Sequence, residues 1–261
     1  MIEYFKNHIN LRKSNKYKIV VNDFLISDFN HIFNEINFFK LHSLSKGDVF
    51  LQLIRISDNK VFANIAFYLS SHNQYQSPAR GTFGGISAVD NIDFSLLEEF
   101  LTTVVNELLL KNSSMIRIKL QPLSHNPQLF SLCLNIFSRL NFSITSYDLN
   151  YSLEIDNEVF LSKLSHGNQK KVKQCLRDGF FASKLDISKF GEAYEVIQSN
   201  RESKGYPMTI DKSSFLEMVK IFPESIHCFA VFNPTHLSMV ASGICISINP
   251  HILYVFSVLK M

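Results

Sequence analysis

The stretch from Ser77 to Ile86, with the sequence SPARGTFGGI, has the residue types best suited to holding a ligand. Gly81, Gly84 and Gly85 allow the backbone to approach a ligand closely or to adopt positive φ. Arg80 carries a planar fork of donors that fits a phosphate or a carboxylate. These residues predict a binding site at the mouth of a sheet. A Gly-rich bend with a solvated Arg80 is the alternative interpretation.

A second set of candidate residues lies on a basic run in the second half of the chain. Lys170, Lys173 and Arg177 are spaced at i, i+3 and i+7, so they share one face of a predicted helix. That face could bind the phosphates of a tRNA, a nucleotide-sugar or a lipid carrier. A solvated charged face is the alternative, and no interleaved aromatic residues indicate base stacking.

The remaining nucleophilic and metal-binding residue types show no chemical pattern. The four cysteines are far apart in the sequence, with no CxxC pair, and they favour a reduced, cytoplasmic compartment. The histidines of the second half have no metal-ligand spacing either, so no metal site is predicted. His125 precedes Asn126-Pro127 at the end of a predicted strand, where it is either a site residue or a helix-start residue.

The composition limits the class of protein. A length of 261 residues suits one large domain or two small ones, and 46% hydrophobic residues allow a sizeable core. The net charge of +3 is too small to imply nucleic-acid binding by itself. We expect no signal segment at the N-terminus and no membrane span, because no apolar run reaches about 20 residues.

The first half is predicted to alternate strands and helices around the Gly-rich stretch. A helix is expected from a cap at Ser27 to about Phe39, because its apolar residues recur on one face. The next helix after the Gly-rich stretch is capped at Asp93 or Ser95 and buries a stripe from Leu97 onward. The predicted strands are 17–21, 49–56, 61–69 and 115–120, and a third helix covers 126–140.

The second half is predicted to place helices before a run of strands. An extended segment at 142–155 leads to a charged helix that is capped at Asp156 or Asn157 and stopped by Gly179. A strand at 180–187 and helices at 190–204 and 209–221 come next. Three strands are expected at 226–232, 237–248 and 251–259. Since both halves have helices followed by strands, we predict a long-range repeat with a boundary near residues 150–160.

This order of elements resembles the GNAT acyltransferase fold. The sequence SPARGTFGGI at 77–86, followed by an amphipathic helix and the strand IRIKLQP at 116–122, looks like the first domain of FemAB-like proteins. These are tandem-GNAT acyl- and aminoacyltransferases. In the second half, the basic helix, the sequence NRESKGYP at 200–207 and the run ASGI at 241–244 add to the likeness. The resemblance covers most of the chain and implies an α/β (α+β) fold of tandem GNAT-like domains, 1–155 and 156–261. Each domain is expected to have a mixed, mostly antiparallel sheet flanked by helices.

Two departures from the family pattern stand out. GNAT enzymes that use acyl-CoA hold its pyrophosphate with a loop like Q/R-x-x-G-x-G/A, and the stretch from Arg80 to Gly85 misses this spacing by one residue. The chain also stops just after a third strand, where a complete second domain would continue. We therefore expect a truncated second domain, with its last strand covered by another chain, as in a homo-oligomer, or by the first half.

The resemblance implies transfer of an acyl or aminoacyl group onto an amine, with a cell-wall or surface-glycan precursor as the expected acceptor. Acyl-CoA or aminoacyl-tRNA is the implied donor, and no resident cofactor is expected. Tyr206 lies in a loop where acceptors enter similar folds, with a packed loop aromatic as the alternative. The predicted substrate- or donor-binding residues are Arg80, Gly81, Gly84, Gly85, Lys170, Lys173, Arg177 and Tyr206.

No catalytic residue is assigned, because direct attack by an amine requires no covalent nucleophile. The second hypothesis for function is a GNAT-derived binding or assembly module without catalysis. The two hypotheses share the fold and differ in whether any product forms.

Overall fold

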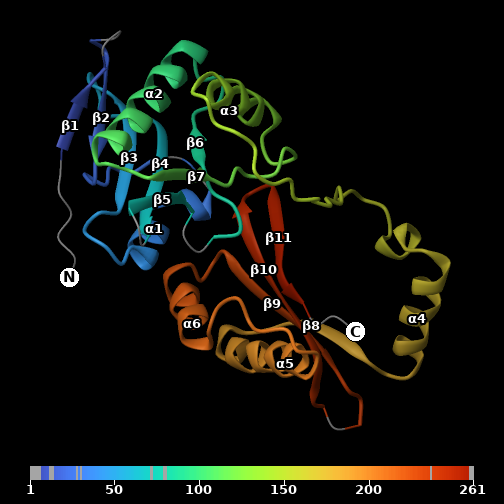
Figure 1. Cartoon of the computed structure of the whole chain (residues 1–261). Coiled ribbons are helices and arrows are strands. Elements are labelled where there is room, and N and C mark those ends of the chain that lie inside the picture. Colours follow the sequence, from blue (N-terminus) through green and yellow to red (C-terminus); the bar gives the residue numbers. More distant parts are fainter. Residues whose placement is uncertain are drawn as a thin grey trace. The chain divides into compact units, whose positions relative to one another are not determined.

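The computed structural model describes residues 7–11, 15–27, 29, 31–70, 73–78, 81–235 and 237–258. The chain divides into two compact units, Met1–Ser152 and Leu153–Met261. Each unit has a sheet flanked by helices, and most strand pairings are antiparallel, so the predicted fold class is confirmed (Figure 1). Within the described part of the chain, no helix has the length and apolar character that crossing a membrane would require.

The sheet of the first unit is mixed, with the strand order β1-β2-β3-β4-β5-β7 and with β6 paired to β4. All of its pairings are antiparallel except the pairing of β5 with β7. The strands are β1 (Asn7–Asn10), β2 (Tyr17–Val21), β3 (Val49–Arg55), β4 (Val61–Ser70), β5 (Gln74–Ser77), β6 (Ile86–Ala88) and β7 (Met115–Ile118).

Helices cover both faces of this sheet because the strand residues alternate between two apolar faces. On one face, α2 (Phe94–Leu110) buries the predicted stripe that starts at Leu97, and α3 (Pro127–Arg139) packs beside it. On the other face, α1 (Ile36–His42) packs Phe39 against Phe50. Adjacent β3 residues therefore point into different cores.

The helix predicted from Ser27 to Phe39 is wrong over its first part. The described residues there have no regular secondary structure up to His31, and a short 3-10 turn, η1 (Ile32–Asn34), precedes α1. The reason is Gln52, a fully buried residue of β3. Its carboxamide accepts a hydrogen bond from the Leu25 N–H (2.8 Å) and donates one to the Leu25 carbonyl (2.7 Å), which holds this segment along the sheet.

Asp48 fixes the connection between α1 and β3. It is buried, and its carboxylate accepts hydrogen bonds from the Ser43 hydroxyl (2.8 Å) and from the N–H groups of Leu44 (2.9 Å), Ser45 (3.0 Å) and Leu69 (2.6 Å). A buried carboxylate is stable only when such donors surround it. Asp48 therefore ties the end of α1 to β4.

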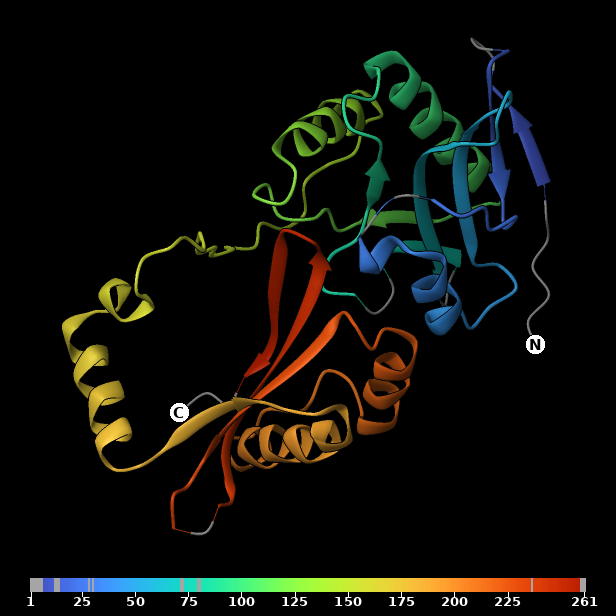
Figure 2. The ribbon, with the colours of Figure 1, turned by 180° about the vertical axis from the view of Figure 1, so that it is seen from behind.

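The sheet of the second unit is antiparallel throughout, with the order β11-β10-β9-β8 (Figure 2). Its strands are β8 (Phe181–Lys184), β9 (Ile226–Phe232), β10 (Met239–Asn249) and β11 (Ile252–Val258). Helix α5 (Phe190–Ser203) packs on β10, where the Ser242 hydroxyl donates to the Ala193 carbonyl (2.7 Å), and α6 (Lys212–Ile221) follows it. The opposite face exposes Phe229, Leu253 and Val255.

The two units repeat one order of elements: a strand, two helical segments, and then three consecutive antiparallel strands. In the first unit these are β2, η1 with α1, and then β3, β4 and β5. In the second they are β8, α5 with α6, and then β9, β10 and β11. The strand β11 lies at the edge of its sheet, and its cover by another chain stays a prediction.

The segment between the units differs from the prediction in part. Residues 143–156 carry no regular structure and no strand partner, and their apolar side chains, such as Leu149 and Tyr151, are exposed. The charged helix does not start at Asp156 or Asn157. A 3-10 turn, η3 (Phe160–Lys163), comes first, and α4 covers His166–Arg177. Its end is as predicted, because Gly179 adopts φ +83° just beyond it.

Candidate functional site

The Gly-rich stretch forms a loop that leaves the sheet and returns to it. β5 pairs with β7 in parallel up to Ser77 and Ile118. The backbone returns at Gly84, which bridges to Leu120 and donates its N–H to the Lys119 carbonyl (2.9 Å). β6 then pairs with residues 63–65 of β4.

The helix predicted after the stretch is present as α2, which is capped at Asp93. A short strand that was not predicted, β6, lies between them and pairs with β4, which satisfies backbone groups of that strand. The loop that precedes α2 is formed by residues 89–93. Arg80 lies outside the described residues, so its position at the edge of a cleft stays a prediction.

The glycines of this loop have a packing reason to be glycine. A Cβ on Gly84 would lie 2.9 Å from the Pro78 ring, and one on Gly81 would lie 3.1 Å from it. Gly85 has φ +82°, and its Cβ would lie 3.1 Å from a Leu120 methyl group. The chain itself therefore occupies the space beside these glycines. Their contact with a ligand stays a prediction.

A buried histidine, His31, and a half-buried one, His125, contact the loop through Phe83. The Phe83 ring centroid lies 6.0 Å from that of His31 and 4.9 Å from that of His125, both edge-to-face. Neither ring nitrogen of His31, nor Nδ1 of His125, has a hydrogen-bond partner among the described residues. Unpaired buried polar atoms are rare, and they gather at functional sites more often than elsewhere.

Burial disfavours the charged form of both imidazoles. It lowers the pKa of His31 to about 4, with a further lowering from His125, and the neighbouring Gln121 side chain offsets this only in part. Burial also lowers the pKa of His125. Sequence reasoning missed His31, because a lone histidine within the predicted helix from Ser27 to Phe39 gives no signal of a site. Asn126, rather than His125, caps α3.

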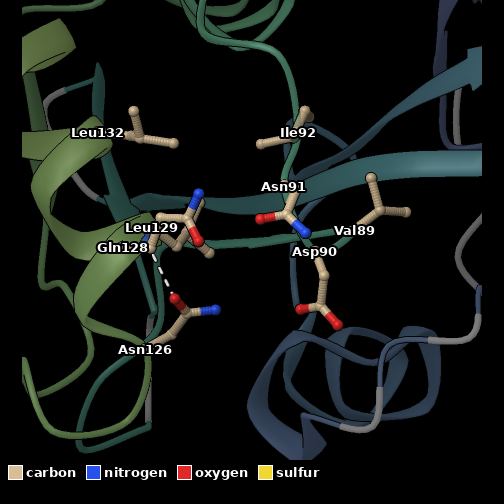
Figure 3. A pocket seen from close by; sticks show the side chains of 8 residues that line it. All are labelled: Val89, Asp90, Asn91, Ile92, Asn126, Gln128, Leu129 and Leu132. Carbon is tan, nitrogen blue, oxygen red and sulfur yellow. Dashed lines mark hydrogen bonds between the residues drawn. The ribbon is translucent and has the colours of Figure 1, made fainter.

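A small hollow lies near this region, between the loop before α2 and the start of α3 (Figure 3). It has a volume of about 40 Å³. Both helix N-termini beside it are capped by the chain's own side chains. Asp93 accepts from the Leu96 N–H (3.0 Å), and Asn126 accepts from the Leu129 N–H (2.9 Å). Its lining is Val89, Asp90, Asn91, Ile92, Asn126, Gln128, Leu129 and Leu132.

The candidate residues of the second unit fall in two separate places. Lys170, Lys173 and Arg177 lie on α4, are exposed, and form no ion pair with a described residue. Tyr206 is 61% exposed in the turn between α5 and α6. Arg201 orders this turn, because its guanidinium donates to the Pro207 carbonyl. For both places the binding interpretation and the structural one stay open.

The described residues contain no group of three or more His, Cys, Asp and Glu side chains that could hold a metal ion. The cysteines are unpaired, and three of them are buried. Burial raises the pKa of the thiols of Cys133 and Cys228 to about 12, so both are protonated at neutral pH. The site chemistry of the described residues therefore rests on imidazole, amide, carboxylate and ammonium groups.

Comparisons with known proteins give a likeness at the level of structure alone. No protein-family model matches the chain, and no curated protein matches it. A crystal structure of FemX aligns with 76% of this chain at 17% sequence identity and a TM-score of 0.48. The chain spans about half the length of that protein (51%). A likeness this distant carries no argument about activity.

Proposed function

We propose that the chain is an N-acyltransferase or aminoacyltransferase of FemAB-like type. Its donor is acyl-CoA or aminoacyl-tRNA, and its acceptor is an amine of a cell-wall or surface-glycan precursor. The observation that supports this best is the parallel pair β5–β7, whose carboxyl ends at Ser77 and Ile118 lie where the Gly-rich stretch begins. The carboxyl ends of adjacent parallel strands are where ligands bind in open α/β sheets.

The proposed reaction is a direct transfer. The amine nitrogen forms a bond to the acyl carbon, and the bond from that carbon to the donor's sulfur or oxygen breaks. The amine gives up a proton to a base, and the leaving group takes up a proton. This chemistry needs positioning and a neutral proton acceptor. In the described first unit, His31 and His125 are imidazoles beside the Gly-rich loop whose pKa is lowered by burial, which favours their neutral form.

The predicted site residues belong to the proposal in named roles. Arg80, Gly81, Gly84 and Gly85 contact substrate in the first unit. Lys170, Lys173 and Arg177 hold the phosphates of the donor, and Tyr206 contacts the acceptor. A cytoplasmic location is part of the same proposal, since all the cysteines are unpaired.

The proposal is tested by product formation. The purified chain is incubated with acyl-CoAs in one series and aminoacyl-tRNAs in another, each with nucleotide-linked peptide and amino-sugar acceptors. Mass spectrometry should show one acyl residue added to an acceptor amine with one donor class. No product with any donor would favour the non-catalytic binding module instead.

The role of α4 has its own test. Replacing Lys170, Lys173 and Arg177 together with Glu should lower the salt dependence of tRNA binding by about one unit of slope for each phosphate that is no longer neutralised. The exposed Lys60→Glu, in the first unit, is the matched control. Equal slopes for the triple variant and the wild type would exclude α4 from donor binding.

A further inference from the structure

The hollow before α2 has one polar side and one apolar side. We propose that it binds a primary ammonium group on a short aliphatic stem, and that it is not a phosphate site. The polar lining consists of Asp90, Asn91, Asn126 and Gln128. The apolar lining consists of Val89, Ile92, Leu129 and Leu132.

The caps of the two helices exclude a phosphate from this hollow. A helix N-terminus attracts anions through its free N–H groups. Here the Asp93 carboxylate already accepts from the first turn of α2, and the Asn126 side chain does so for α3. Pro127, the first residue of α3, has no N–H to offer. A phosphate would also face the negative charges of Asp90 and Asp93 at close range.

The acceptors on the polar side suit an ammonium group. An ammonium carries three N–H donors and no acceptor. Asp90, Asn91 and Gln128 are exposed, and their side-chain oxygens make no hydrogen bond to a described residue, so a ligand would replace only water at these acceptors. Figure 3 shows Asp90 and Asn91 on one wall of the hollow and Asn126 and Gln128 on the other. Among the described residues of the lining, the only charged side chain is a carboxylate.

The apolar side suits an aliphatic stem. Ile92 and Leu129 are buried, and Val89 and Leu132 are half-buried, so methylene groups would meet a preformed apolar wall. The volume of about 40 Å³ has room for about three water-sized groups, enough for the ammonium and two methylenes, so the terminal methyl group of a propyl stem would lie at the opening of the hollow. A hard metal ion fits poorly, because the described lining offers a single carboxylate.

The link between this hollow and transfer rests on the proposed function, in which it would anchor a cationic part of the acceptor. Binding itself needs no activity. The test is a titration of the uniformly ¹⁵N-labelled chain with n-propylammonium chloride at constant ionic strength, followed through the side-chain amide signals of Asn91, Asn126 and Gln128. Pyrophosphate and tetramethylammonium, a cation without N–H groups, are titrated in parallel.

The expected result is a saturable shift of these amide signals with n-propylammonium, with a Kd of about 1–10 mM. With four heavy atoms, this probe cannot bind much more tightly than about 40 μM. Asp90→Asn should weaken binding at least tenfold. Leu132→Phe, which fills the hollow without changing charge, should weaken it as much. Asp178→Asn removes the same charge from the other unit and should leave the Kd unchanged.

Three results would overturn the inference: pyrophosphate shifting these signals in place of n-propylammonium, tetramethylammonium binding equally well, or unchanged affinity in folded Asp90→Asn and Leu132→Phe. The proposed function fails in a different way. If n-propylammonium binds and no donor yields product, the ammonium site is supported and the transferase proposal is rejected. If product forms but the amide signals do not respond, the transferase proposal is supported and the ammonium site is rejected.

Discussion

Acidification should destabilise the first unit through His31. Its side chain is 8% exposed, and its ring nitrogens have no hydrogen-bond partner among the described residues. Burial lowers its pKa from 6.5 to about 4. Between pH 4 and pH 6.5 the His31 imidazole is protonated in the unfolded chain and neutral in the folded chain. Stability is therefore highest above pH 6.5, falls as the pH drops from 6.5 to 4, and is then constant with respect to this group.

The magnitude follows from the two pKa values. At pH 5 the unfolded imidazole is almost fully protonated and the folded one almost fully neutral, which corresponds to a loss of about 2 kcal/mol relative to pH 7.5. Below pH 4 the loss of stability due to His31 reaches its limit of about 3.4 kcal/mol. His125 contributes in the same direction, because burial lowers its pKa too. Glu35 acts in the opposite direction, since burial raises its pKa. A comparison of the wild type with a His31 variant cancels the contributions of His125 and Glu35, because both proteins carry these residues.

The assay compares the wild type with His31→Phe by urea unfolding, followed by circular dichroism at pH 7.5 and pH 5. On acidification from pH 7.5 to pH 5, the free energy of unfolding of the wild type should fall by about 2 kcal/mol more than that of the variant. An NMR titration of the His31 imidazole should also give a midpoint near 4. A midpoint near 6.5, or the same pH dependence in both proteins, would refute the argument.

Three further predictions concern stability, each measured by urea unfolding. Gln52→Leu should destabilise by about 2–4 kcal/mol, because it leaves a buried backbone N–H and C=O unpaired; a loss under 1 kcal/mol would show that the segment before η1 is not held by this carboxamide. Asp48→Ala should destabilise by about 3 kcal/mol or more, since several buried donors lose their acceptor; wild-type stability would contradict the role given to this network. Gly85→Ala should cost about 1–2 kcal/mol from its positive φ and its contact with Leu120, while Gly167→Ala, with no atom within 4 Å of the new Cβ, should be neutral or slightly stabilising; equal effects at the two positions would contradict the packing argument.

Much of the fold could be predicted from the sequence, because the elements that carry the cores have strong periodicity and clear ends. The cap at Asp93, the start of α3 at Asn126-Pro127 and the stop at Gly179 lie where predicted. Strand β9 matches its predicted bounds, and β10 and β11 differ from theirs by one or two residues. In each case local chemistry and tertiary packing favour the same structure.

The predictions were wrong where a residue that is distant in the sequence determines the local structure. The apolar spacing before α1 is helical, but Gln52, from β3, bonds both the N–H and the carbonyl of Leu25, so a helix cannot use these groups. β6 was not predicted, because its three residues form a strand only through their pairing with β4. The hollow and the orphaned nitrogens of His31 depend on which residues meet in space, and their spacing in the sequence gives no sign of this.

The packing of the Gly-rich loop has a consequence for mutational scans of this protein. Pro78 and Leu120 fill the space beside Gly84 and Gly85, so any larger side chain there strains the loop. A scan scored by activity alone would mark both positions as intolerant, and an observer would naturally assign them to ligand contact. Pairing each activity score with the abundance of folded protein would separate the two causes. Loss of activity at full abundance would indicate contact with a ligand, whereas a parallel loss of both would indicate packing.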